Sequence, residues 1–355
     1  MRIVFFVIIT ILIFARYLSQ KPKYNDGDRV MITTTLSNEP RRYSNAQAII
    51  ISGLKIYLPS YPEINYGDRL VVTGIVEGNK LSDAQVKEIK PVKNNLFRAR
   101  KKIIDGFMRF LPEPHSSLLA GIVLGSKQAL PADFDVALKK TGTMHVVVAS
   151  GMNISLVANF LITSLVHFVS RKKALLFALI GIWLYSAVAG FEPPVIRAAV
   201  MGSMAFLAQA TGRLYYAIHT LFISASLMLL VNPLWLIDIG FILSFVATLS
   251  LLIFEKPIRA RLSSVPKIIR EDLSTSLAAQ IGVGPVIFAA FGQFNPLSPL
   301  VNALVLWTIP PVTVIGMIGG IMILYIPLIG NLIVLLSYPF TTYFISVVKL
   351  SAIIL

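Results

Sequence analysis

The order of hydrophobic and polar positions divides the chain into two parts that meet near residue 112. Before this point short apolar stretches alternate with polar residues, and after Pro114 long apolar runs follow one another with brief interruptions. A transmembrane helix needs about twenty consecutive, mostly apolar residues, and several of the later runs approach that length. The pattern therefore predicts a soluble module followed by a membrane module.

An apolar run over residues 3–14 comes first, and it is typical either of a signal-peptide core or of a short membrane anchor. A signal peptide would carry a small-x-small cleavage site after this run. Residues 16–20, with the sequence Arg-Tyr-Leu-Ser-Gln, offer none. We therefore predict a retained anchor helix within residues 1–23.

Residues 24–93 have the pattern of a small β domain. Four stretches, at residues 28–36, 48–58, 69–76 and 84–89, are rich in β-branched residues and are separated by turn-forming residues. The same Gly-Asp-Arg sequence opens two of them, at Gly27 and Gly67, as expected of a turn that leads into a strand. Several short strands in so small a region predict a barrel of the OB type.

Residues 94–112 predict an amphipathic helix, because apolar positions recur at helical spacing and the other positions are mostly basic. The apolar set is Phe97, Ile103, Ile104, Phe107 and Leu111, and the basic set is Arg98, Arg100, Lys101, Lys102 and Arg109. Such a helix can lie flat on a membrane surface. It can equally pack on the β domain with its basic face in solvent, and the sequence leaves both alternatives open.

Residues 113–355 predict an α-helical polytopic bundle. The candidate spans are residues 144–169, 174–189, 195–210, 216–230, 234–254, 274–291 and 300–318, and one or two more follow after Gly320, divided by Pro339. Residues 116–125 are apolar over too short a distance to cross a bilayer. They predict either a re-entrant segment beside a watery cavity or a helix buried within the bundle.

The distribution of Lys and Arg predicts the orientation. When the spans alternate, the basic loops at residues 171–173, at Arg213 and at residues 256–270 fall on one side, and the opposite loops contain no Lys or Arg. Basic loops mark the cytoplasmic side. We therefore expect a multi-pass protein of the cytoplasmic (inner) membrane whose β domain is extracytoplasmic.

The composition excludes some classes of protein and some kinds of site. The chain is 55% hydrophobic and 14% charged, which is too apolar for a soluble protein, and it contains no cysteine to form a thiolate metal site. His145 and Ser150 lie five positions apart, about 140° around a helix, a poor arrangement for a nucleophile and its base. We predict no enzyme activity, no cofactor and no metal site. The net charge of +15 favours an anionic partner, although Lys and Arg also orient membrane proteins.

An ordered series of motifs between about residues 118 and 311 resembles the ComEC family of competence DNA-uptake proteins. In chain order, the matching pieces are an apolar segment ending at Gly125, Leu130-Pro131, Gly142-x-x-His145, Ser150-Gly151-x-Asn153, Arg197-Ala-Ala-Val-Met201, Gly240-Phe-x-Leu-Ser-Phe245 and Gln280 with Pro285, Pro296 and Asn302. The β domain ahead of them is similar in place and size to the OB-like domain of the family.

Some positions depart from the family pattern. Asn153 stands where many relatives have a second histidine, and Pro194 stands where a small hydroxyl residue is common. Many relatives also carry a metallo-β-lactamase-like nuclease domain, but no His-x-His-x-Asp-His sequence occurs here. The resemblance therefore implies a separate nuclease, together with DNA-receptor and motor proteins as partners.

The resemblance implies a transmembrane channel subunit that takes up single-stranded DNA during natural transformation. A charged strand needs a hydrated path, and polar residues within the spans are its candidate lining. These candidates are His145, Ser150, Gly151, Asn153, Arg197, Asp238, Ser244 and Gln280. Each can instead join neighbouring helices, and Arg197 can form an ion pair with Asp238 or Glu192.

Outside the membrane, the resemblance leads us to expect that the basic helix attracts DNA through Arg98, Arg100, Lys101 and Lys102. Two other functions stay open at this point. One is a transporter or channel for another solute on the same scaffold. The other is a membrane-embedded hydrolase.

Overall fold

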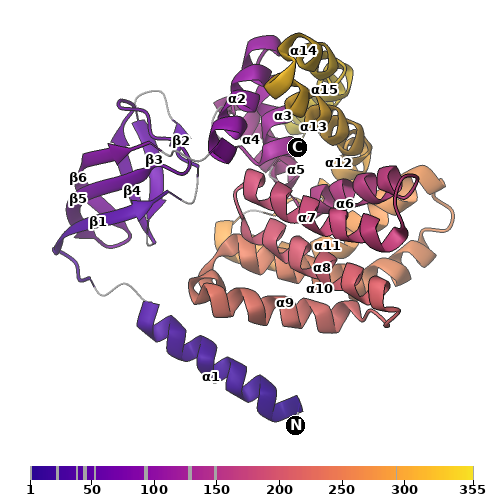
Figure 1. The fold of residues 1–355 in the computed structure, drawn as a ribbon, viewed down its shortest axis with the longest axis horizontal. Helices are drawn as coiled ribbons and strands as arrows, with labels where there is room; N and C mark the ends of the chain where they lie inside the picture. The colour runs from indigo at the N-terminus through magenta and orange to yellow at the C-terminus, as the bar shows by residue number, and fades with distance from the viewer. Residues whose placement is uncertain are drawn as a thin grey trace.

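The computed structural model of the protein describes residues 2–20, 24–36, 39–42, 46–51, 53–91, 95–126, 130–147, 150–292 and 294–354. The predicted domain boundaries at residues 23 and 93 fall on gaps in these ranges. Figure 1 shows a β domain, an N-terminal helix and a large helical part. The helical part consists of two groups, α2 to α5 with α12 to α15, and α6 to α11.

The predicted anchor is a helix, α1, over Arg2–Gln20. It contacts α9 (Ala217–Val231) and the short 3-10 helix η1 (Pro233–Ile237). Arg16 Nη2 donates a hydrogen bond to Val231 O at 3.5 Å. The helical part of the anchor prediction is therefore confirmed, and its retention stays a prediction.

The β domain is an open sheet rather than a closed barrel. Its strands are β1 (Arg29–Thr35), β2 (Arg41–Arg42), β3 (Ala46–Ile51), β4 (Leu54–Pro59), β5 (Arg69–Glu77) and β6 (Lys80–Lys90). The strand order is β1-β5-β6-β4-β3-β2, with β4 and β6 parallel and the other neighbours antiparallel. Among the described residues β1 and β2 are the two edges and do not pair, so the predicted barrel is wrong. Barrel closure needs exactly that edge-to-edge pairing.

The predicted strand over residues 48–58 is a hairpin of β3 and β4. Gly53 lies at its turn with φ +84°, a conformation that a residue with a Cβ adopts only under strain. The two Gly-Asp-Arg turns are confirmed and have the same geometry. Asp28 Oδ2 accepts from the backbone N of Asn25, and Asp68 Oδ2 accepts from that of Asn65, both at 2.8 Å.

The amphipathic segment forms α2 over Asn95–Phe110. The remaining helices are α3 (His115–Leu124), α4 (Ala132–Thr141), α5 (Met144–Val147), α6 (Gly151–Leu165), α7 (Arg171–Ala189), α8 (Pro193–Thr211), α10 (Ile239–Arg261), α11 (Lys267–Phe291), α12 (Ser298–Val305), the 3-10 helix η2 (Leu306–Thr308), α13 (Ile309–Tyr325), α14 (Pro327–Leu335) and α15 (Tyr338–Ile354). One apolar core joins α2 to α5 with α12 to α15, and a second lies among α6, α7 and α8.

The helical part is that of a multi-pass membrane protein. Four segments in the described chain are long and apolar enough to cross a bilayer, at residues 171–189, 239–261, 269–291 and 298–325. A fifth is possible if α14 and α15, which meet at a 42° bend, form one broken span. The predicted span over residues 144–169 is instead interrupted, because α5 ends at Val147 and α6 begins at Gly151.

Two hydrogen bonds from α2 show that the predicted alternation of spans does not continue unbroken to α13. Arg100 Nη1 donates to Val188 O near the end of α7, and Lys102 Nζ donates to Leu324 O near the end of α13 at 3.2 Å. Because the two donors are two residues apart, the C-terminal ends of α7 and α13 lie on the same side. Strict alternation puts them on opposite sides, so at least one segment between them does not cross as a simple span.

The short apolar segment near residue 120 is α3, and it is buried within the bundle. Every residue from Ser116 to Leu124 is buried. The helix packs closely on its neighbours, since a Cβ at Gly121 would lie 2.4 Å from Val147 O and one at Gly316 would lie 2.4 Å from Val123 Cγ2. Of the two alternatives for this segment, the structure supports the buried helix.

Candidate functional site

The break between α5 and α6 lies at the first group of predicted site residues. Ser150 has an extended backbone, with φ −113° and ψ 168°, and immediately precedes the first turn of α6. Gly151 begins the helix and Asn153 lies in its first turn. The chain therefore leaves the helical conformation at Ser150, within the predicted span over residues 144–169, while residues 148–149 lie outside the described part of the chain.

Arg197 of α8 approaches this break from a neighbouring helix. A Cβ at Gly151 would lie 3.0 Å from Arg197 Nη2, so the small residue leaves room for the guanidinium. Arg197 Nη1 donates to Ser244 O of α10 at 2.9 Å. Within the described residues, Arg197 Nε and Ser244 Oγ are buried without a hydrogen-bond partner. The guanidinium therefore joins three helices and retains unused donor capacity.

Asn153, in the first turn of α6, links this break to the carboxyl end of α3. The last carbonyls of a helix have no partner within it, and burying them unpaired is costly. Asn153 Nδ2 donates to Ile122 O at 2.6 Å and Tyr185 Oη donates to Val123 O at 3.0 Å. Arg100 Nη1 donates to Leu124 O at 2.7 Å. Three side chains from three helices thus complete the buried end of α3.

Arg100 is not part of an exposed DNA-attracting surface, which corrects the sequence prediction. Its side chain is 4% exposed and forms an ion pair with Glu39 of the β domain, whose side chain is 8% exposed. Its guanidinium also lies over the Tyr66 ring, 5.3 Å from the centroid. Arg100 therefore connects the β domain to α3 and α7, and its charge suits the negative end of the α3 dipole.

Tyr66 completes this junction from the side of the β domain. Its ring meets that of Phe97 in α2 edge to face, with centroids 4.9 Å apart. A Cβ at Gly190 would lie 3.5 Å from the Tyr66 hydroxyl. Burial raises the pKa of Tyr66 above its ordinary value, so the ring beside Arg100 is a neutral phenol at physiological pH.

The other predicted site residues have their described contacts elsewhere. Asp238 is exposed and caps α10 by accepting from Phe241 N at 2.8 Å, rather than pairing with Arg197. Gln280 Nε2 donates to Asn295 O at 2.8 Å. His145 is exposed, with Nδ1 3.0 Å from Gly142 O. The described contacts therefore gather Ser150, Gly151, Asn153, Arg197 and Ser244 and leave these three apart.

The exposed cations of α2 form a separate surface. Arg98, Lys101, Lys102 and Arg109 are exposed, whereas Ile103, Ile104 and Phe107 are buried against the bundle. The helix is therefore amphipathic as predicted. The DNA-attracting role of Arg98, Lys101 and Lys102 stays a prediction.

The fold and the polar cluster define a multi-pass helical membrane protein with an adjoining β domain. The family described as "Competence protein" matches residues 122–354. The chain belongs to this family, in agreement with the motifs in its sequence.

Two curated relatives match the membrane part. The chain is 24% identical to "ComE operon protein 3" of Bacillus subtilis over 233 residues, which are 65% of this chain and 30% of the relative. It is 33% identical to an "Uncharacterized protein" of Aquifex aeolicus over 215 residues, 60% of this chain and 49% of the relative. The chain thus spans half or less of each relative. No solved structure matches.

Sequence reasoning missed the Arg100 junction, although a signal for it was present. Arg100 precedes Ile103, Ile104 and Phe107 by three, four and seven positions, which places it on the same face of the helix as those apolar residues. A basic residue on a buried face needs a partner. Its partners Glu39 and Tyr66 come from another domain and could not be identified from local sequence.

Proposed function

We propose that this chain forms the transmembrane channel subunit through which single-stranded DNA crosses the cytoplasmic membrane during natural transformation. Membership of the competence protein family supports the process, and the polar cluster at the α5–α6 break supports a path within this chain. The channel is passive in itself. A separate nuclease, a DNA receptor and a motor would prepare and drive the strand.

The observation that carries the proposal is the placement of Arg197. Arg197 lies near the start of α8, within a span predicted from the sequence. An arginine costs about 2.5 to 3.5 kcal/mol at the centre of a membrane helix on insertion scales, so one inside a span requires a partner or water. Here one nitrogen donates to Ser244 O, and Nε has no partner among the described residues. A planar, permanently charged group with spare donors suits successive phosphates that pass it.

The Arg197 role is tested by uptake of labelled DNA into cells that lack the gene and are complemented with variants. Arg197→Gln removes the charge and should abolish most of the uptake, while Arg197→Lys keeps the charge and should retain part of it. Arg213→Gln is the matched control, because Arg213 is exposed just beyond the other end of α8. All variants must reach normal levels in the membrane.

Two outcomes would contradict this assignment. If Arg197→Gln lowers the amount of protein in the membrane and uptake falls only in proportion, Arg197 is structural. If cells without the gene take up DNA normally under competence conditions, the chain is no DNA channel, and a transporter for another solute becomes the better description.

The orientation is part of the proposal, with the β domain extracytoplasmic and the α10–α11 loop cytoplasmic. Since the chain has no cysteine, single introduced cysteines can report the side. Ser60 of the β domain and Ser264 of the loop are both exposed. In intact cells an impermeant thiol reagent should label Ser60→Cys and spare Ser264→Cys. The reverse labelling would overturn the orientation.

A further inference from the structure

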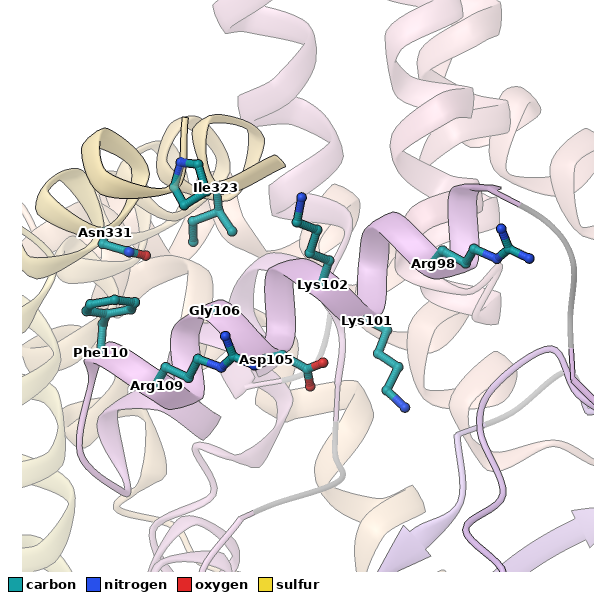
Figure 2. Close-up of a pocket in the computed structure, with 10 residues that line it drawn as sticks. Arg98, Lys101, Lys102, Asp105, Gly106, Arg109, Phe110, Ile323 and Asn331 are labelled. Carbon is teal, nitrogen blue, oxygen red and sulfur yellow. The ribbon is translucent and has the colours of Figure 1, made fainter. Parts of the chain in front are cut away.

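A cavity of about 400 Å³ lies between α2 and the α13–α14 pair, at a distance in sequence from the Arg197 cluster. Four basic residues of α2 line it, Arg98, Lys101, Lys102 and Arg109, against a single carboxylate, Asp105. Figure 2 shows these side chains spread along the helix, with Phe110 and Asn331 at one end of the cavity and Arg98 at the other. The charge of this wall selects an anionic ligand.

The opposite wall is apolar. It is formed by Ile323 of α13 and by Pro327, at the start of α14. Beyond this wall, Tyr325 is 79% exposed and Leu328 is 73% exposed. In a membrane protein, such side chains face lipid. The cavity therefore opens where a basic helix meets a lipid-facing surface.

One polar group on the apolar side is unused. Asn331 is 8% exposed and lines the cavity, and its Oδ1 has no hydrogen-bond partner among the described residues. A buried amide without a partner is costly unless a ligand or water meets it. Asn331 Oδ1 is therefore free to accept a hydrogen bond from a polar group of a bound ligand.

The position of α2 in the fold fixes the floor of the cavity. A Cβ at Gly106 would lie 2.9 Å from Ile323 Cδ1, so the Ile323 side chain packs directly on the backbone of α2. Lys102 Nζ donates to Leu324 O at 3.2 Å and holds the same helices together. Arg100, between the cavity-lining residues Arg98 and Lys101, forms an ion pair with Glu39, so the cavity lies on the side of the bundle that adjoins the β domain.

We propose that this cavity binds the head group of an anionic phospholipid, with its phosphate among the basic residues of α2 and its acyl chains along α13 and α14. The phosphate of a lipid can pair with the basic wall while its acyl chains pack on the apolar wall. A DNA strand would instead bring its charged backbone against Ile323 and Pro327. Basic pockets at the ends of membrane helices are suited to such head groups.

Native mass spectrometry of the purified full chain, with added phosphatidylglycerol or phosphatidylcholine, tests the site. Phosphatidylglycerol should bind at least about tenfold more tightly than phosphatidylcholine, and Lys101→Gln with Arg109→Gln should reduce its affinity by about tenfold. The matched control is Lys80→Gln with Lys87→Gln, two exposed positions of β6 with the same loss of charge. The control should bind as the unmodified chain does.

Two competitors distinguish the source of the phosphate. Neither inorganic phosphate nor an oligothymidylate should displace the lipid. Displacement by the oligonucleotide, with the same loss in the Lys101 and Arg109 variant, would assign the cavity to DNA and overturn the proposal. Equal binding of the two lipids, or an equal loss in the control, would also overturn it.

Asn331→Leu, which leaves the charges intact, should weaken lipid binding on its own. Because no DNA uptake is measured, this result is independent of the proposed channel function.

Discussion

The β domain and the helical part differ in how they use buried polar groups. In the β domain, Gln47 is 2% exposed, and its amide donates to Pro59 O and Pro62 O and accepts from Ile64 N. In the described chain, six buried side-chain polar atoms have no hydrogen-bond partner, and all lie in the helical part: His115 Nδ1, Asn153 Oδ1, Arg197 Nε, Ser244 Oγ, Asn302 Oδ1 and Asn331 Oδ1.

The unpaired atoms of the helical part leave donors and acceptors that water or a ligand can meet. A soluble domain satisfies its buried polar groups internally, since each unpaired one costs about 1 to 3 kcal/mol. Three of the six atoms belong to the cluster at the α5–α6 break, and a fourth lines the cavity beside α2. Four of the six unused polar atoms therefore lie at the two places where we propose that a strand and a lipid bind, and the other two, His115 Nδ1 and Asn302 Oδ1, lie elsewhere.

The largest effect on the free energy of unfolding is expected at the Arg100 junction between the β domain and the helical part. Arg100→Met removes the hydrogen bonds that Arg100 donates to the Glu39 carboxylate and to two helix-end carbonyls, and should lower the free energy of unfolding by about 4 kcal/mol. Chemical denaturation of the purified protein in detergent measures it. Arg29→Met, at an exposed position of β1, is the control and should change little. A loss no larger than that of the control would mean that Arg100 does not hold the regions together.

A smaller but still large effect is expected within the β domain. Gln47→Leu keeps the approximate volume and leaves two carbonyls and one N–H unpaired, so the free energy of unfolding should fall by about 3 kcal/mol. Gln85→Leu, exposed in β6, is the matched control. If both variants have the same free energy of unfolding, the hydrogen bonds of Gln47 do not stabilise the β domain measurably. The contrast drawn between the β domain and the helical part would then be wrong for the β domain.

Within the bundle, Asn153→Leu should cost about 1 to 2 kcal/mol, because Ile122 O loses its donor while the unpaired Oδ1 is removed at the same time. Ser155→Leu, on the exposed face of the same helix, should be nearly neutral. The same unfolding assay applies. A loss above that of Gln47→Leu would show that the bundle depends on its polar groups more than the β domain does, contrary to the comparison.

Local pattern was enough to predict the membrane class and the amphipathic helix, because each depends on residues close in sequence. The barrel was wrong because strand order depends on pairings between distant segments, such as the parallel contact of β4 with β6. The sequence pattern predicted that Arg197 is one of the polar residues within the membrane spans. Its partner Ser244 O is a backbone atom 47 residues away, and no side-chain pattern could indicate it.

The central claim is that a DNA strand passes the cluster at the α5–α6 break. A single cysteine at Ser150, in this otherwise cysteine-free chain, can be labelled with a negatively charged thiol reagent during uptake of labelled DNA. Ser60→Cys in the β domain, which the same reagent should reach, serves as the control. We predict that labelling at position 150 blocks uptake and that DNA in transit slows the labelling, with neither effect at position 60. Complete labelling at position 150 with undiminished uptake would contradict the account.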